Sequence, residues 1–157
     1  MKILRSYGLV LLAALALCST ALGATPKKLG AYVGHTSQNG SARLQLDVWG
    51  SVMDASFDYG CDGAEPTRFT QALWRVTPKK PHLKVTKTGS FSYSGTVKTW
   101  ELPRPLSFSD PSAPFQKARL TIHGRFTSAT KAGGTVRISG AGCDSGALTW
   151  TATLGGR

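Results

Sequence analysis

The stretch RLTIHGRF, residues 119–126, alternates polar and apolar side chains at every second position. Successive side chains of a β-strand point to opposite faces, so this pattern predicts a strand with one buried and one solvated face. The same period of two recurs in residues 43–48, 53–61 and 148–154, and in the first of these it places Val48 on the buried face. The repeated alternation predicts an all-β chain.

Turn residues separate these stretches at short intervals. Asn39-Gly40 is the dipeptide preferred in a type I′ hairpin turn, and Gly50-Ser51 fits a type II′ turn. We therefore expect about 8–9 short antiparallel strands, forming either a β-sandwich or a small β-barrel, between which periodicity does not decide. The long connection at about residues 101–116 is expected to be a loop, because it is rich in proline, which cannot donate to a sheet.

Composition restricts the class of protein. Hydrophobic residues make up 41% of the 157 residues and charged residues 17%, which excludes an intrinsically disordered chain. The 18 glycines and 8 prolines are typical of a fold with many turns and no long helices.

The first 23 residues have the pattern of a removable export signal. Lys2 and Arg5 give a positive start, residues 8–17 are an apolar run, and residues 21–23 have the small residues that a signal peptidase recognises. Cleavage after Gly23 leaves 157 − 23 = 134 residues. We expect these, residues 24–157, to form a single β domain that is secreted or held in the cell envelope.

The apolar run of the signal also bears on how the protein meets the membrane. It is shorter than the roughly 20 residues that a helix needs to cross a bilayer, so no membrane span is expected. Residues 15–18, Leu-Ala-Leu-Cys, resemble a bacterial lipoprotein box, in which Cys18 would be lipidated instead of removed. Leu17 departs from that box, which has Gly or Ala at this position, and the fate of Cys18 stays open.

Cleavage of the signal leaves two cysteines, Cys61 and Cys143, which are 143 − 61 = 82 residues apart. Two lone cysteines in an exported chain predict a single disulfide. The alternation of residues 53–61 places Cys61 on the buried face of its strand. Neither cysteine belongs to a C-x-x-C pair, so no metal site and no redox motif is predicted.

Positive charge is concentrated in one part of the chain. The mature protein has 17 basic and 8 acidic residues, a net charge of +9, and the segment between Glu65 and Glu101 contains seven basic residues and no acidic one. Such a segment predicts binding to an anionic polymer, such as an acidic polysaccharide or another envelope polymer. The alternative is that these lysines only keep edge strands soluble. The candidate polymer-binding residues are Arg68, Arg75, Lys79, Lys80, Lys84, Lys87, Lys98 and Trp100.

A second basic row lies on the polar face of the strand at 118–126. It consists of Lys117, Arg119, His123 and Arg125. Arg137 would join this row if the strand paired with residues 134–139 as a hairpin, although a plain solvated outer face explains the row as well. The phase of the tryptophans places Trp74 and Trp150 in the core, Trp49 out of phase with its strand, and Trp100 beside the proline-rich loop with Phe115.

For catalysis the sequence provides little. His35, His82 and His123 belong to no recognisable motif, and there is no G-x-S-x-G elbow, no zinc spacing and no phosphate-binding glycine loop. We therefore predict a non-catalytic protein without cofactor or metal. Two alternatives stay open, a small envelope hydrolase and a carrier of a small apolar ligand in a barrel interior.

Two groups of residues, near the two ends of the predicted β domain, form one combined pattern. One is an amino-terminal Tyr-x-Gly-x-Thr-Ser-Gln segment, here residues 32–38. The other is a carboxy-terminal pattern made up of Gly124, Phe126, Gly133, Gly134, Thr135, Cys143, Ser145, Gly146, Thr149, Trp150, Thr151 and Ala152. This combined pattern resembles a known family of small exported bacterial all-β proteins of uncharacterised function. The resemblance implies export and an all-β fold with a cysteine pair, and it implies no activity.

Overall fold

The structure is a computed structural model that describes residues 23–61, 69–75, 77, 81–101, 115–140 and 142–155. The predicted export signal lies outside the described residues except for Gly23, and so does most of the proline-rich loop, residues 102–114. Three of the candidate polymer-binding residues, Arg68, Lys79 and Lys80, lie outside them as well.

Every regular element in the described part of the chain is a β-strand. The strands are β1 (Ala31–Thr36), β2 (Ser41–Leu46), β3 (Val52–Tyr59), β4 (Thr70–Arg75), β5 (Ser90–Glu101), β6 (Gln116–Ser128), β7 (Lys131–Gly140), β8 (Cys143–Asp144) and β9 (Leu148–Leu154). The predicted all-β fold is confirmed. Among these residues there is also no helix long and apolar enough to cross a membrane.

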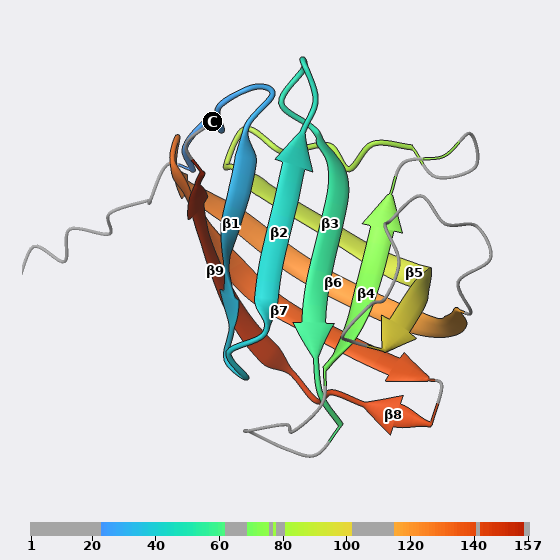
Figure 1. Cartoon of the computed structure of the whole chain (residues 1–157). Helices are drawn as coiled ribbons and strands as arrows, with labels where there is room; N and C mark the ends of the chain where they lie inside the picture. The colour runs from blue at the N-terminus through green and yellow to red at the C-terminus, as the bar shows by residue number, and fades with distance from the viewer. Residues whose placement is uncertain are drawn as a thin grey trace, which may run out of the picture.

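Eight of the strands close into an antiparallel barrel. Strands β1 to β7 follow one another around the wall, β9 lies between β7 and β1, and the pairing of β6 with β7 completes the ring (Figure 1). The ninth strand, β8, adds to β7 outside the ring. Of the two predicted architectures, sandwich and barrel, the protein adopts the barrel. Closure of the barrel leaves no long unpaired strand edge.

Aromatic rings pack across the interior of the barrel. Phe57 meets Trp150 with ring centroids 5.6 Å apart, Tyr32 meets Phe126 at 5.1 Å, and Phe91 meets Phe126 at 5.7 Å. All five side chains are buried, and they come from β1, β3, β5, β6 and β9. An eight-stranded barrel is just wide enough for side chains to fill its interior, and here large rings occupy it.

Two glycines allow the strands on one side of the barrel to approach closely. A Cβ on Gly124 would lie 2.2 Å from Cζ of Phe91, and a Cβ on Gly134 would lie 1.9 Å from the carbonyl oxygen of His123. Gly124 and Gly134 are direct partners in the pairing of β6 with β7. A side chain at either position would displace its neighbour, so the local course of the wall depends on these glycines.

Three hairpin loops share one construction, which differs from the predicted turns. In the β1–β2 loop, Asn39 N–H donates to the Thr36 carbonyl at 2.9 Å, and Thr36 N–H donates to the Gly40 carbonyl at 2.8 Å. Asn39 has a φ of 63°, whereas Gly40 has no positive φ. The predicted type I′ turn is therefore wrong, because that turn needs positive φ at both central residues, and a three-residue loop ending in a left-handed residue takes its place.

The β2–β3 loop and the loop at residues 86–90, just before β5, repeat this arrangement. Gly50 N–H donates to the Asp47 carbonyl with a φ of 81° at Gly50, and Gly89 N–H donates to the Thr86 carbonyl with a φ of 74° at Gly89. The predicted type II′ turn at Gly50-Ser51 is thus also wrong. Because β2 ends at Leu46, Val48 lies in the loop and is 48% exposed, against its predicted burial.

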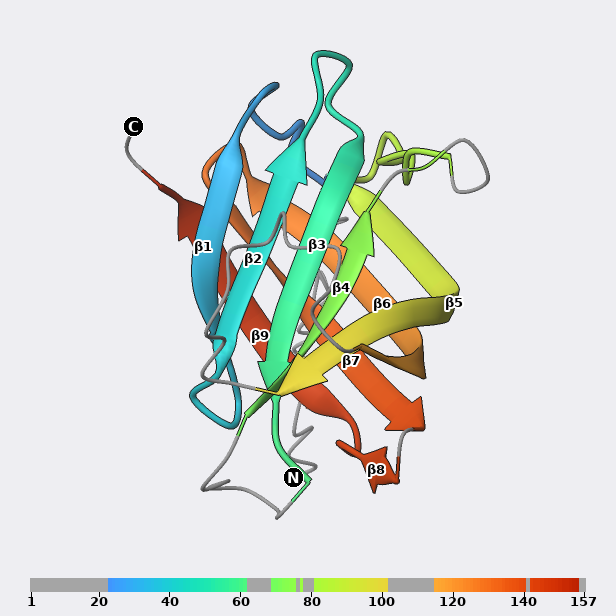
Figure 2. The ribbon, with the colours of Figure 1, turned by 45° about the vertical axis from the view of Figure 1, so that its right-hand side comes forward.

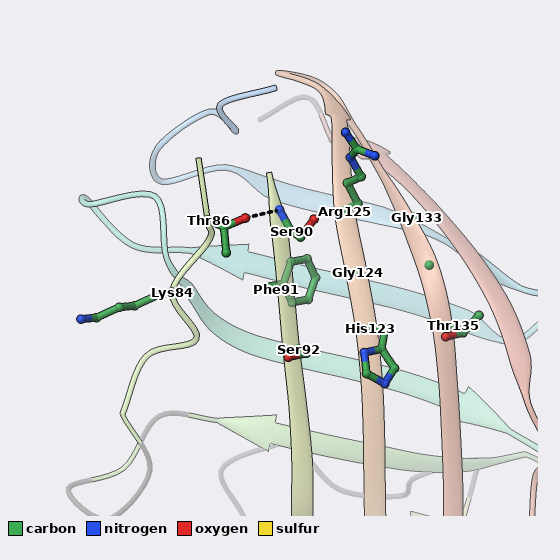
Figure 3. A pocket seen from close by; sticks show the side chains of 11 residues that line it. Lys84, Thr86, Ser90, Phe91, Ser92, His123, Gly124, Arg125, Gly133 and Thr135 are labelled. Carbon is green, nitrogen blue, oxygen red and sulfur yellow. Dashed lines mark hydrogen bonds between the residues drawn. The ribbon is translucent and has the colours of Figure 1, made fainter. Parts of the chain in front are cut away.

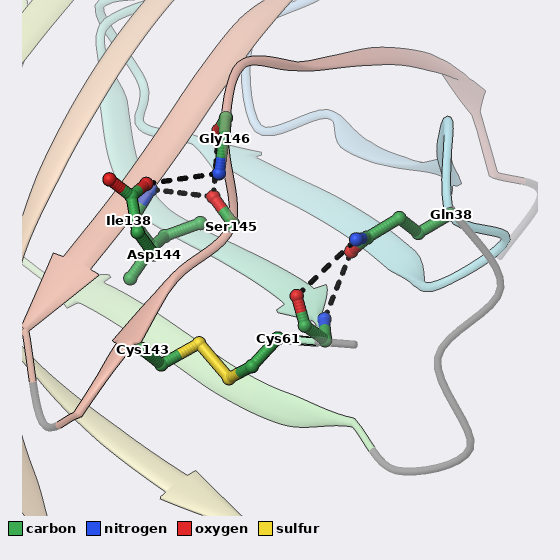
Figure 4. The surroundings of a disulfide bond; sticks show 8 residues. Gln38, Cys61, Ile138, Cys143, Asp144, Ser145 and Gly146 are labelled. Atoms are coloured by element: carbon green, nitrogen blue, oxygen red, sulfur yellow. Dashed lines mark hydrogen bonds between the residues drawn. A yellow bond between two sulfur atoms is a disulfide. The ribbon is translucent and has the colours of Figure 1, made fainter. Parts of the chain in front are cut away.

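The disulfide between Cys61 and Cys143 is present, with a Cα–Cα distance of 5.5 Å (Figure 4). Cys61 is exposed, against its predicted inward position, because β3 ends at Tyr59 and the chain leaves the barrel there. Gln38 holds this exit in place. Its side-chain amide donates to the Gly60 carbonyl at 3.3 Å, and its side-chain oxygen accepts from Gly60 N–H at 2.9 Å.

Candidate functional site

The outer face of β5 and β6 combines positive charge with hydroxyl groups. Lys117, Arg119, His123 and Arg125 occupy alternate positions on β6, as predicted, and the residues opposite them on β5 are Lys98, Thr96, Ser92 and Ser90. Lys84, on the segment that precedes β5, lies beside the Arg125 end of this face. The name basic wall is used below for Lys84, Lys98, Lys117, Arg119, His123 and Arg125.

A groove of about 620 Å³ lies at the Arg125 end of the basic wall (Figure 3). Its basic residues are Lys84, His123 and Arg125, and its hydroxyl groups come from Thr86, Ser90, Ser92 and Thr135. Among the described residues that line the groove there is no carboxylate. His123 and Arg125 project from β6 toward the viewer in Figure 3, whereas Lys84 extends away at the edge.

The local sequence explains why the wall is hollow at this point. Gly133 is the register partner of Arg125 and provides no side chain on the outer face, so β7 leaves a gap beside the guanidinium. On the other side, the Thr86 loop forms a raised edge against the start of β5. Thr86 N–H donates to the Ser90 carbonyl at 2.8 Å, and Ser90 N–H donates to Thr86 Oγ1 at 3.1 Å.

Beyond the groove, the wall is ordered by hydroxyl contacts and carries an unfavourable charge pair. The Arg119 guanidinium donates to Ser94 Oγ at 3.2 Å, which fixes its direction along the wall. Lys98 and Lys117 are direct register partners on β5 and β6. Like charges at opposing positions destabilise a sheet, and the Lys98 ammonium, 4.0 Å from the centre of the Phe115 ring, gains a partial compensation.

The structure separates the basic segment predicted from the sequence. Arg75 lies on the opposite wall, where its guanidinium binds Asp54 at 2.7 Å. Lys87 is exposed in the hairpin loop, Lys84 lines the groove, and Lys98 belongs to the far end of the wall. Trp100 is half-buried, with its ring 6.3 Å from that of Phe115. The basic residues that are close together in the sequence therefore lie on different parts of the barrel surface.

Residues 118–126 do pair with residues 134–139, and this pairing places Arg137 opposite Thr121. Arg137 nevertheless does not add charge to the wall, because its guanidinium forms two hydrogen bonds with the Asp144 carboxylate. These bonds hold the pKa of Asp144 below its ordinary value and raise the pKa of Arg137. The pair joins β8 to β7 instead.

Sequence reasoning missed the hydroxyl residues of the groove and of the wall beyond it. Ser90, Ser92, Ser94 and Thr96 occupy every second position of β5, and three of them are exposed on its outer face. This alternation was visible in the sequence, but its significance depends on β5 lying beside the basic row of β6. Thr86 and Thr135 reach the groove from two further elements, which no local pattern indicates.

One histidine lies against a carboxylate. Nδ1 of His82 is 2.6 Å from Oδ2 of Asp47, and the Trp49 ring packs edge-on beside the imidazole. A buried carboxylate beside a histidine is one part of a catalytic triad, but neither His82 nor Asp47 is among the residues that line the groove. The same part of the chain contains no group of three or more potential metal ligands from His, Cys, Asp and Glu.

A smaller hollow of about 270 Å³ lies on the opposite wall, over β1 to β4. Its charged residues are Arg43, Asp54 and Arg75, so positive and negative groups are mixed there. Burial outweighs the hydrogen bond from Arg75 and raises the pKa of Asp54. This mixed surface contrasts with the groove, whose charged residues are all potential cations.

No family model, curated protein or solved structure matches the chain. The resemblance to small exported bacterial β proteins therefore stays a prediction, and the function is argued from the geometry of the barrel.

Proposed function

We propose that the protein is an exported, non-catalytic binding domain that holds an anionic polymer of the cell envelope or its surroundings on the basic wall. The observation that carries this proposal is the groove lined by Lys84, His123 and Arg125 together with four hydroxyl residues and, among the described lining, no carboxylate. Cations attract the polymer, and hydroxyl groups donate or accept hydrogen bonds with its sugar, sulfate or phosphate oxygens.

The shape of the wall favours an extended ligand over a single small ion. Side chains two residues apart on a strand are about 6.6–6.8 Å apart, so the cations along β6 form a row. That row runs from Arg125 to Lys117, where Lys98 stands directly opposite. A bound anion at this end would relieve the repulsion between the two lysines. Binding of a polyanion is therefore favourable at both ends of the wall.

The interior and the histidines support this proposal over its alternatives. A carrier of an apolar ligand needs space inside the barrel, where the rings of Phe57, Phe91, Phe126 and Trp150 pack against one another. A hydrolase needs its acid–base pair where a substrate binds, whereas the pair of His82 and Asp47 is separate from the groove.

Retention on immobilised heparin, an anionic polysaccharide, tests the proposal. The variant Lys84→Gln/Arg125→Gln removes two charges from the groove. Its matched control, Arg43→Gln/Arg75→Gln, removes two charges from β2 and β4 on the opposite wall. We expect the groove variant to elute at clearly lower salt than the native protein and the control to elute close to it.

The salt dependence of affinity provides a second readout. Each cation–anion contact contributes about 0.7–0.9 to the slope of log affinity against log salt for nucleic acids, so loss of two contacts should reduce the slope by about 1.5. If the groove variant and the control elute together, the positive charge acts non-specifically and the proposed site is wrong.

A further inference from the structure

Three exposed apolar side chains gather at one end of the barrel. Leu29 is 53% exposed, Val48 48% and Trp49 76%, and they are three of the five exposed large hydrophobic residues in the described part of the chain. Leu29 N–H donates to the Asp47 carbonyl at 3.0 Å, which places Leu29 beside the β2–β3 loop that carries the other two. Figure 2 shows this loop projecting beyond the barrel wall. The three residues are called the apolar tip below.

The loop that presents Trp49 is held by a buried carboxylate. Asp47 Oδ1 accepts hydrogen bonds from the backbone N–H groups of Trp49 and Ser51, both at 2.8 Å, while Oδ2 lies 2.6 Å from His82. The indole is therefore exposed on a preformed turn, and little conformational freedom is lost when it enters a partner.

Two lysines lie beside the apolar tip. Lys27 and Lys28 are exposed in the same segment as Leu29, and a Cβ on Gly50 would lie 3.9 Å from Cγ of Lys28, so the stem of this lysine runs beside the loop. Asp47 is the one acidic residue in residues 24–30 and 46–52, both fully described, and it is buried. The tip thus presents apolar groups and ammonium groups without an exposed carboxylate.

We propose that the apolar tip docks the protein on a lipid surface that carries anionic headgroups. Tryptophan favours the boundary between headgroups and acyl chains, and flanking lysines contact the lipid phosphates. A sugar ligand would use the flat face of Trp49 and gain nothing from the hydrogen-bond-free side chains of Leu29 and Val48. An acyl layer accommodates all three. This surface is separate from the basic wall, so the inference goes beyond the proposed function.

Sedimentation with lipid vesicles tests the docking surface. Vesicles of phosphatidylcholine and phosphatidylglycerol at 3:1 should bind the native protein, and Trp49→Ala should lower the partition coefficient at least about tenfold, the effect of losing one large buried side chain. Val33→Ala serves as the matched control, because Val33 is a 46% exposed residue on β1 outside the tip. It should bind as the native protein does.

Two further variants separate charge from apolar insertion. Lys27→Gln/Lys28→Gln should weaken binding to the mixed vesicles and leave the weaker binding to pure phosphatidylcholine unchanged. The groove variant Lys84→Gln/Arg125→Gln should still bind vesicles in a Trp49-dependent manner, while Trp49→Ala should keep its retention on heparin. These expectations make failure of the tip distinguishable from failure of the groove.

Tryptophan fluorescence reports insertion directly. Trp74 and Trp150 are buried in the barrel, and Trp100 is half-buried beside Phe115. A blue shift of emission on vesicle binding that disappears in Trp49→Ala therefore comes from Trp49. Circular dichroism of that variant should match the native spectrum, because the replaced side chain is exposed. If native protein does not bind the anionic vesicles, or if Trp49→Ala binds them equally well, the proposal is overturned; binding lost only in the groove variant overturns it too.

Discussion

Asp47 organises the β2–β3 hairpin through a single buried carboxylate. One of its oxygens accepts two backbone hydrogen bonds, and the other lies 2.6 Å from Nδ1 of His82. We predict that Asp47→Ala lowers the free energy of unfolding by about 3 kcal/mol, because two backbone donors lose a charged acceptor. Urea unfolding measures this value. Val48→Ala, at an exposed side chain of the same loop, is the control. A loss below about 1 kcal/mol for Asp47→Ala would contradict this prediction.

Gly124 affects the stability of the barrel through the buried Phe91 ring, which packs against it. The missing Cβ leaves room for the Phe91 ring, which also contacts Phe126 and Trp150. Gly124→Ala should therefore destabilise the barrel by about 2–3 kcal/mol through overpacking. The double variant Gly124→Ala/Phe91→Leu should recover part of that loss in thermal unfolding. Additive losses in the double variant would show that the two residues do not interact.

The hairpin loops show what a local pattern can and cannot specify. Asn39-Gly40 and Gly50 correctly marked the turns, because left-handed backbone favours these residues. The turn type was wrong, since it depends on which carbonyl closes the loop, and that is fixed by strand register. Val48 continued the alternation of its strand in sequence, yet the loop had already begun.

At the scale of elements, the two-residue strand β8 depends on side chains for its attachment. It pairs with β7 through Ser139 and Gly140, and the Arg137–Asp144 pair adds hydrogen bonds between the same elements. Because the folded pKa of Asp144 lies below its unfolded value, the pair stabilises the fold above a pH of about 4. This contribution is lost as pH falls through the lowered pKa.

Carboxyl titration by NMR checks these directions. The midpoint of Asp144 should lie below the ordinary aspartate value, and Arg137→Gln should return it toward that value. Asp54 gives the opposite sign, because burial raises its pKa. Its protonation is tighter in the folded state, so acidification through the raised pKa favours folding. A midpoint of Asp144 above that of Asp54 would refute the assignment.

The alternating pattern predicted which residues face the core, but it did not predict which strands pair with each other. It assigned Ala55, Phe57, Leu120 and Ile122 correctly to the core, because a period of two fixes the face directly. It did not reveal that Asp54 and Arg75 are register partners, which removes Arg75 from the candidate site. The groove also depends on pairing, since Lys84 and Arg125 meet only when β5 lies beside β6.

At the scale of the whole molecule, the sequence did not predict whether the strands close into a barrel. Strand patterns are the same in a sandwich and in a barrel. The difference lies in the contacts of β1 with β9 and of β6 with β7, and the first of these joins the two ends of the described chain. No local signal encodes such a contact, whereas the cysteine pair was predicted because only two cysteines follow the predicted export signal.

The disulfide should contribute much of the global stability. It joins residues 82 apart, and a loop of that length restricts the unfolded chain by about 4–5 kcal/mol in the chain-entropy model. Cys61→Ser/Cys143→Ser should lose a comparable free energy of unfolding in urea. Intact mass with and without alkylation provides the control, because the native protein should show no free thiol at either cysteine. A variant as stable as the native protein would rule out this role.

The position of the disulfide also determines what one cut of the backbone can do. Cys61 and Cys143 enclose β4, β5, β6 and β7, the strands that include most of the basic wall. A protease that cleaves any single peptide bond between them produces two pieces that stay covalently linked. In the closed ring each piece also keeps antiparallel neighbours from the other. A single cleavage therefore gives two fragments that stay together. We expect the basic wall to keep its structure after that cleavage.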